Sequence, residues 1–267
     1  MVRRKSVQRA RTKAMGSEFL GGDRGLHRGP TPSYSPVSRQ DAQRMIDATF
    51  ELMSQTGVGF DPVPDLMDRL RGAGCDVSPE GLVKFPVELI QKSIDSVAKS
   101  VRLWNRDGST SIEIDCQHTW FVPGVTCIKV YDGETGEARD SNREDLATVT
   151  RVSDAMRNID AVCVTCKNVG ESTIHGEIDE FSALAENTTK PLIYLCEYAE
   201  SLGVVIDMAT AIRGGRQELV DKPYFMHMIT PLPLYYAKPH IDQLINAVEA
   251  GIPVSYTHLT LPTILRV

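Results

Sequence analysis

Apolar segments in the second half of the chain recur at a nearly constant spacing. Each begins near a polar or small residue and has the composition of a buried strand, with starts at Asp160, Lys190, Lys222 and Gly251. A spacing of about 30 residues is one strand plus one crossover helix. Apolar residues between these segments recur at helical intervals, which predicts amphipathic helices. The three stripes are Ile174, Ile178, Phe181 and Leu184; Leu202, Val205, Ile206 and Ala209; and Ile241, Leu244, Ile245 and Val248.

This alternation predicts an α/β fold, in which residues 159–253 form the first half of an eight-fold, TIM-type β/α barrel. We expect an incomplete (β/α)8 barrel, because a polar loop and an amphipathic helix should follow the fourth strand and neither does. The run from Val254 to Thr263 resembles the translated read-through of a sequencing adapter. Residues 254–267 are therefore expected to be adapter read-through, with a natural terminal strand as the alternative.

Residues 38–158 have a different pattern, which predicts a cap of helices and β-hairpins before the barrel. Ser38 is the expected N-cap of a first helix, a second helix covers Val63–Leu70, and Phe85-Pro86 opens a third. We expect Ser141 to cap a further helix whose inner face carries Leu146, Val149, Val152 and Met156. Strands are expected at Val101–Trp104, Ser111–Ile114, Trp120–Val122 and Cys127–Tyr131, with the hairpin turn at Asp132–Gly136.

Composition and charge predict a soluble, cytoplasmic protein that contacts neither membrane nor nucleic acid. The hydrophobic fraction is 42% and the charged fraction 24%, both ordinary globular values. No apolar run approaches the roughly 20 residues that a membrane span needs. Residues 1–37 are expected to be a disordered basic arm, for which a nucleic-acid tail is the alternative. The remainder is acidic, which favours cationic substrates.

The cysteines invite a metal or redox hypothesis, chiefly through Cys163 and Cys166. Residues three apart on a strand point to opposite faces, so these two thiols should diverge. Cys75, Cys116, Cys127 and Cys196 lie in unrelated contexts. We therefore expect reduced, buried cysteines and no metal site.

An ordered set of short passages resembles the trimethylamine methyltransferase family of corrinoid-dependent methyltransferases. The most recognisable are Val130-Tyr-Asp-Gly-Glu-Thr-Gly-Glu-Ala-Arg139, Glu144-Asp-Leu and Ser153-Asp-Ala-Met-Arg-Asn-Ile-Asp160. Gly57-Val-Gly-Phe, Leu70-Arg-Gly-Ala-Gly-Cys75, Val83-Lys-Phe-Pro86, Asn187-Thr-Thr-Lys-Pro191 and Ala250-Gly-Ile-Pro253 also fit the family. The resemblance runs from about Gln43 to Pro253, and family members are nearly twice as long as this chain, in agreement with a truncated barrel.

The resemblance implies an enzyme of methylamine metabolism or methanogenesis. It implies methyl transfer from a methylated amine, such as trimethylamine or glycine betaine, to the Co(I) corrinoid of a separate partner protein. This chain would bind no cofactor itself, and the full-length form would be a homo-oligomer. Founding members carry pyrrolysine at a position beyond Pro253, and other members lack it. Catalytic residues are therefore expected beyond Pro253, and residues 1–253 are expected to be inactive and to aggregate when expressed alone.

Candidate substrate-binding residues follow from the barrel hypothesis, because barrel sites gather at the carboxyl ends of the strands. A methylated ammonium favours aromatic faces and a nearby carboxylate. The residues of that chemistry at the expected strand ends are Glu171, Glu197, Tyr198, Thr230 and Tyr235. Packing or solvation is the alternative role for each. His227, in mid-strand, is expected to be a core histidine rather than a base.

Two other classes stay open. Another β/α-barrel enzyme, aldolase-like or a pterin-linked methyltransferase, would share the strand period but not the ordered N-terminal passages. A Schiff-base lysine in such an enzyme would have to be Lys167. The second class is a non-catalytic protein that binds quaternary amines. Methyl transfer to added Co(I) corrinoid separates the enzyme from the binder.

Overall fold

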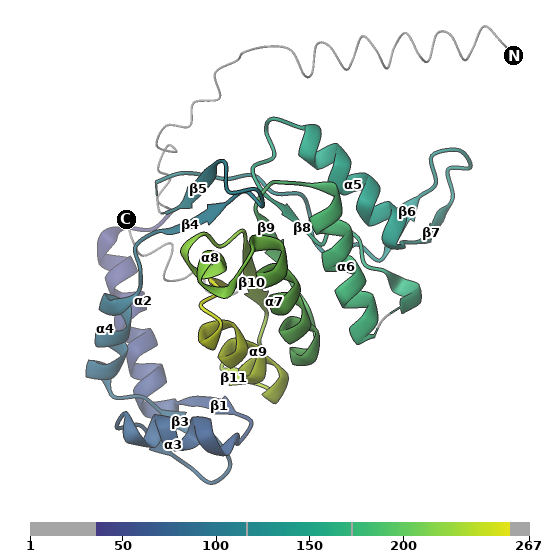
Figure 1. Ribbon diagram of the computed structural model, residues 1–267. Helices are drawn as coiled ribbons and strands as arrows, with labels where there is room; N and C mark the ends of the chain where they lie inside the picture. The colour runs from purple at the N-terminus through teal and green to yellow at the C-terminus, as the bar shows by residue number, and fades with distance from the viewer. Residues whose placement is uncertain (1–35, 116, 172, 257–267) are drawn as a thin grey trace, which may run out of the picture.

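A computed structural model describes residues 36–115, 117–171 and 173–256 of the chain. The structure is mixed α/β, and its central element is a four-stranded parallel sheet of order β12-β10-β9-β8 (Figure 1). The strands are β8 (Val162–Cys163), β9 (Leu192–Tyr194), β10 (Phe225–Ile229) and β12 (Val254–Tyr256). All four lie within or directly after the segments predicted from the sequence, so the strand period is confirmed.

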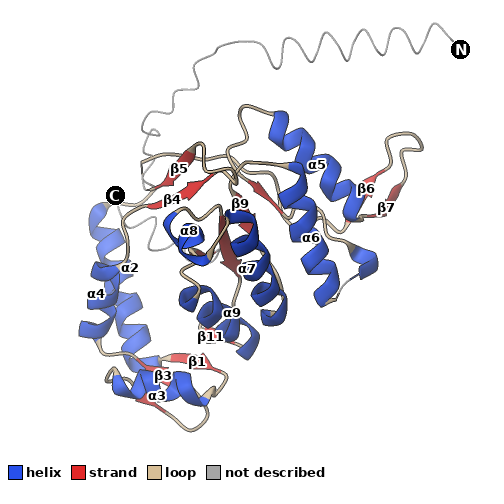
Figure 2. Ribbon diagram, viewed as in Figure 1, coloured by secondary structure: helices blue, strands red, loops and turns tan. Residues whose placement is uncertain are grey.

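Helices cover one face of this sheet (Figure 2). They are α6 (Ile174–Asn187), α7 (Ala199–Arg213), the short α8 (Arg216–Asp221) and α9 (Lys238–Glu249). Alternate strand residues pack against them in one apolar cluster with Val162, Leu192 and Phe225 at its centre. The α7 stripe is confirmed, because all four of its residues are buried. The α9 stripe is wrong at Val248, which is 64% exposed at the outer end of the helix.

A strand-like segment extends the sheet beyond β8. Thr126 and Cys127 donate their backbone N–H groups to Val164 and Thr165 (2.8 Å each), and Cys127 forms a parallel bridge with Cys166. Helix α5 (Arg143–Ala155) then packs on α6 in the helical layer. The β/α repeat therefore includes elements that precede residue 159.

Hairpins flank this core at two places. β4 (Val101–Trp104) pairs with β5 (Ser111–Ile114), as predicted, and lies at the amino ends of the parallel strands. There Trp104 N–H donates to Pro223 O (2.8 Å). The hairpin of β6 (Lys129–Tyr131) and β7 (Ala138–Asp140) also forms as predicted, and it projects from the body at the right of Figure 1.

The strand expected at Trp120–Val122 is wrong. This stretch has no strand pairing, and the Phe121 carbonyl instead accepts a hydrogen bond from Asp160 N–H (2.8 Å).

The expected N-cap of α5 is also wrong. Asn142, not Ser141, accepts from the N–H groups of Glu144 and Asp145 and completes a capping box. The Ser141 hydroxyl donates instead to the carbonyls of Cys127 and Lys167. Of the four residues predicted for the inner face of α5, only Leu146 is fully buried, whereas Val152 (53%) and Met156 (39%) are exposed.

The N-terminal unit consists of helices around a small sheet of order β11-β1-β3-β2. Ser38 caps its first helix as predicted, by accepting from Asp41 N–H. The elements are α2 (Arg39–Glu51), the π-helix η1 (Leu52–Thr56), β1 (Val58–Phe60), α3 (Pro64–Gly72), β2 (Asp76–Val77), β3 (Leu82–Lys84) and α4 (Val87–Ser96). The fourth strand, β11 (Tyr235–Tyr236), comes from the loop after β10 and pairs in parallel with β1. This pairing ties the N-terminal unit to the carboxyl end of the central sheet.

Two predictions fall at the chain ends. The disordered basic arm lies outside the described residues except for Pro36 and Val37. Residues 254–256 form β12, and the rest of the segment expected to be adapter read-through lies outside the described residues. The adapter interpretation therefore stays a prediction. Within the described ranges, no helix is long and apolar enough to cross a membrane.

Candidate functional site

The loop after β8 is held by a buried carboxylate on α6. Glu180, whose side chain is 2% exposed, accepts from Asn168 N–H (2.8 Å) and forms an ion pair with Lys167 Nζ (3.1 Å). Burial raises the pKa of Glu180, and the Asn168 N–H and the Lys167 charge oppose that rise. Lys167 is thus a structural partner of Glu180 and not a free amine.

The loop after β9 is held by a second buried carboxylate, one turn earlier on the same helix. Glu177 accepts from Glu197 N–H (2.6 Å) and from Tyr198 N–H (3.4 Å). Glu177 is 4% exposed, whereas the Glu197 and Tyr198 side chains are exposed. The buried glutamate therefore fixes the backbone of two candidate residues and leaves their side chains facing solvent.

The same loop is held from its other side by a chain of two polar residues. Gln243 of α9 donates its Nε2–H to the carbonyl of Glu197 (2.9 Å), and its Oε1 lies 3.0 Å from His227 Nε2. His227 is fully buried, and burial lowers its pKa to about 4. The prediction of a core histidine is confirmed.

The loop after β10 carries the remaining two candidates. Thr230 directly follows β10 and is exposed. Tyr235 lies further on, in β11, where its hydroxyl donates to Asp61. The next residue, Tyr236, stacks on Phe60 with ring centroids 5.1 Å apart. The structure therefore gives Tyr235 a role in joining β11 to the N-terminal unit, beside any contact with substrate.

Glu171 lies in a short 3-10 helix, η2 (Val169–Glu171), that leads into α6. Its carbonyl passes so close to Gly176 that a Cβ at that position would meet it at 1.6 Å. The glycine thus permits the tight return into α6. Glu171 is exposed, and its backbone N–H donates to Asn168 O (3.0 Å) rather than to a buried side chain.

Together, three loops at the carboxyl ends of adjacent parallel strands carry the candidates. Glu197 and Tyr198 share one anchored loop, whereas Glu171, Thr230 and Tyr235 lie on the loops to either side. This arrangement can present a carboxylate and an aromatic ring to a small cation.

The described cysteines are placed largely as expected, and Cys116 lies outside the described residues. Cys163 Sγ lies 3.1 Å from Pro123 O, whereas Cys166 belongs to the helix-side cluster, so the two thiols diverge. Burial raises the pKa of Cys163 to about 11. Cys75 and Cys196 are buried and free, but Cys127 is exposed, contrary to expectation, because it lies on the outer segment of the sheet. Across the described ranges, no group of three His, Cys, Asp or Glu side chains could hold a metal ion.

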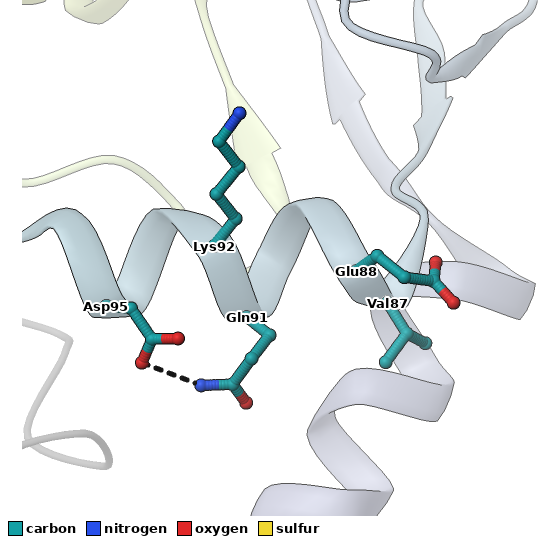
Figure 3. A pocket seen from close by; sticks show the side chains of 5 residues that line it. All are labelled: Val87, Glu88, Gln91, Lys92 and Asp95. Atoms are coloured by element: carbon teal, nitrogen blue, oxygen red, sulfur yellow. Dashed lines mark hydrogen bonds between the residues drawn. The ribbon is translucent and has the colours of Figure 1, made fainter.

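Hollows elsewhere on the molecule have less suitable chemistry. One of about 550 Å³ lies along α4, lined by Val87, Glu88, Gln91, Lys92 and Asp95 (Figure 3). All five side chains are exposed on one helix, and Gln91 is hydrogen-bonded to Asp95 (2.9 Å). A second hollow, of about 300 Å³, is apolar and lies between the N-terminal unit and α9. Neither contains a residue that the sequence singled out for substrate binding.

Residues in the passages that carry the family resemblance mainly form hydrogen bonds and ion pairs that hold turns and neighbouring elements together. Asp132 accepts from the N–H groups of Glu134 and Thr135 in the β6–β7 turn, and Arg139 forms a two-bond pair with Asp145. At the amino ends of the strands, Asp154 accepts from the Thr188 hydroxyl (2.6 Å) and Lys190 Nζ donates to Ser153 O (2.7 Å). Each of these side chains therefore takes part in a contact that joins neighbouring segments of the fold.

Sequence reasoning missed Glu177, Glu180 and Gln243. Glu177 and Glu180 stand four residues before Phe181 and Leu184, on the apolar face of α6. Carboxylates at apolar phase on a helix are the signal that could have found them.

The fold and this site define an α/β protein with carboxylate and aromatic side chains at the carboxyl edge of a parallel sheet. The family model described as trimethylamine methyltransferase (MTTB) matches residues 3–263, and the chain belongs to this family. Over 212 residues it is 27% identical to trimethylamine methyltransferase MttB of Desulfitobacterium hafniense (strain DSM 10664 / DCB-2), covering 78% of this chain and 42% of that protein. Over 234 residues it is 20% identical to glycine betaine methyltransferase of Desulfitobacterium hafniense (strain Y51), covering 86% and 48%. The chain thus spans about half the length of these curated relatives.

Proposed function

We propose that this chain forms part of a methyltransferase that takes a methyl group from a methylated amine, either trimethylamine or a quaternary amine such as glycine betaine. The observation that carries the proposal is the family match over residues 3–263, which includes every anchored loop of the candidate site. The acceptor in this proposal is the corrinoid of a separate partner protein. The parallel sheet, with its helical layer, is proposed to be part of a TIM-type barrel.

The chemistry suits an open carboxyl edge. The corrinoid, when delivered by its partner, supplies a Co(I) nucleophile that takes the methyl group while the C–N electron pair stays on the amine nitrogen. A quaternary ammonium then leaves as a neutral tertiary amine and needs no proton at that nitrogen. Trimethylamine has to react as the trimethylammonium ion, whose N–H proton stays on the departing dimethylamine. The task of this chain's residues is to orient the cation and exclude water from it.

Individual residues have proposed parts in that task. Glu197 offers a carboxylate to the positive nitrogen, and Tyr198, 40% exposed, offers an aromatic face to its methyl groups. Thr230 and Glu171 border the same edge from the neighbouring loops. Tyr235 has the smaller part, because its hydroxyl is already bonded to Asp61 of the N-terminal unit. The identity of the donor amine, homo-oligomerisation and a role in methanogenesis stay predictions.

The test is demethylation of defined donors. The source DNA is resequenced across codon 253, and the protein that it encodes is produced in parallel with residues 1–253. Each form is incubated with Co(I) cobalamin and either trimethylamine or glycine betaine, and dimethylamine or dimethylglycine is measured by mass spectrometry. The Desulfitobacterium glycine betaine methyltransferase is the positive control. We expect one demethylated amine from the longer form. Its absence with every donor, in a reaction where the control is active, would overturn the proposal.

A further inference from the structure

The backbone of Glu197 is held from both sides by buried side chains on two different helices. Glu177 of α6 accepts its N–H at 2.6 Å, and Gln243 of α9 donates to its carbonyl at 2.9 Å. Both holding side chains are buried, with exposures of 4% and 1%. The loop tip between β9 and α7 therefore has little freedom to move relative to these helices.

The Gln243 amide is itself oriented. His227 Nε2 lies 3.0 Å from Gln243 Oε1, which directs the Gln243 NH₂ group toward the Glu197 carbonyl. A neutral His227 that carries its proton on Nε2 donates this bond. The order His227, Gln243, Glu197 thus runs as consecutive donor–acceptor bonds from mid-strand β10 to the exposed loop.

Burying the side chains of this network costs free energy, because charged and polar groups lose their contact with water. Glu177 and Glu180 place two carboxylates in one turn of α6, and the ion pair with Lys167 involves Glu180. Charge from Glu177 further raises the pKa of Glu180. Replacing both partners of a buried ion pair or hydrogen bond by apolar groups of similar shape is often neutral or stabilising, so stability alone does not account for this arrangement. Buried polar networks do specify one geometry, which a site requires of the loop it presents.

We propose that Glu177 and Gln243 are positioning residues for the cation-binding carboxylate of Glu197. This inference rests on the proposed function and adds to it the groups that set where the ammonium binds. Glu177 and Gln243 touch no substrate themselves. They act through the backbone N–H and carbonyl of Glu197, and His227 acts through Gln243.

The test compares Gln243→Met, which keeps side-chain length but removes both hydrogen bonds, with Thr188→Val. Thr188 is the matched control, because it is also buried and holds a loop of the same sheet through Asp154, but at the amino ends of the strands. The probes are glycine betaine and trimethylammonium, each measured by titration calorimetry on the same form of the protein that is used in the demethylation assay. Hydrogen exchange of residues 195–199 is measured on the same samples, and thermal unfolding reports stability.

We expect Gln243→Met to weaken glycine betaine affinity by about tenfold and to speed exchange of residues 195–199, since small displacements of a binding group are costly. Thr188→Val should change affinity less than about twofold at comparable loss of stability. Glu177→Ala should also weaken the affinity for glycine betaine, because it removes the acceptor of Glu197 N–H. Glu177→Gln keeps one acceptor for that N–H and should retain most of the affinity.

The outcomes are separable. Unchanged affinity in Gln243→Met, or equal losses in Gln243→Met and Thr188→Val, overturns the positioning role. If the wild-type protein binds no methylated ammonium, the proposed function fails. Hydrogen exchange at residues 195–199 then still reports whether Gln243 holds the loop. An unchanged exchange rate in Gln243→Met would show that it does not.

Discussion

Arg139 donates two parallel hydrogen bonds to Asp145, from Nη1 to Oδ2 (2.6 Å) and from Nη2 to Oδ1 (2.8 Å). Asp145 also accepts from Asn142 N–H (3.0 Å), so a single carboxylate joins the β6–β7 hairpin to the first turn of α5. The hydrogen bonds from Arg139, and then its charge, hold the pKa of Asp145 below its usual range. Because a fork–fork pair fixes geometry, this contact sets the direction in which the hairpin projects.

Arg139→Lys is expected to loosen the hairpin without unfolding the core, because an ammonium cannot reproduce the two-bond geometry. Amide exchange of residues 129–140 should speed up, while that of β9 and β10 stays unchanged. Lys129→Met is the control, since the Lys129–Asp140 pair is exposed on both sides (62% and 64%) and should contribute little. Equal exchange in the two variants would show that the fork has no special role.

Gly176→Ala is expected to destabilise the protein by at least about 2 kcal/mol, because the new Cβ would overlap a backbone atom that cannot move alone. That atom is Glu171 O, 1.6 Å from the Cβ position. The matched control is Gly203→Ala in α7, where a Cβ meets nothing within 4 Å. The control should stabilise by about 0.5–1 kcal/mol, as alanine does in helix interiors. Urea denaturation of both variants measures the difference, and changes of the same sign would contradict the close approach seen here.

His227 should make stability depend on pH between about 4 and 6.5. Its pKa is lowered from 6.5 to about 4, first by burial. The unfolded chain therefore binds the proton more readily across this window, so stability is complete above pH 6.5 and falls as the pH drops toward 4. The full effect is on the order of 3 kcal/mol.

The comparison for this pH effect is His227→Gln, whose side-chain amide can replace the Nε2–H donor to Gln243 but does not titrate. Denaturation free energies at several pH values should converge for the two proteins as the pH falls, since only the wild type loses the His227 contribution. Parallel pH curves would mean that His227 is not the titrating group.

Local pattern was sufficient where one side of an element is uniformly apolar. β10 is buried at all five residues, and α7 buries Leu202, Val205, Ile206 and Ala209, so both followed directly from periodicity. The Gly59–Tyr235 pairing could not be predicted in this way. It joins segments far apart in the sequence, and β11 is only two residues long.

The cap of α5 shows a different limit. Both Ser141 and Asn142 are good N-caps, and each has an acidic residue three positions later. The tertiary structure decides between them, because the Ser141 hydroxyl is engaged by two carbonyls and Arg139 holds Asp145 in place for Asn142. The candidate site has the same limit. Exposed Glu197 and Tyr198 follow from their position after a strand. The backbone groups that the buried side chains bind could not be predicted, because these hydrogen bonds join segments far apart in the sequence.

Glu197→Gln should reduce binding of the cation while leaving the loop intact, because the substitution preserves the backbone N–H and carbonyl that Glu177 and Gln243 hold. We expect glycine betaine affinity to fall about fivefold to tenfold, the loss of one carboxylate–ammonium attraction in a partly exposed site. The carbon isostere 3,3-dimethylbutanoate has the same shape and the same carboxylate but lacks the positive nitrogen, so its weaker binding should not fall further in the variant. Glu200→Gln, the same charge change in the first turn of α7, is the control and should leave both affinities unchanged. A parallel loss for both ligands would mean that Glu197 shapes the site rather than recognising its charge, and no loss for either would remove Glu197 from the site.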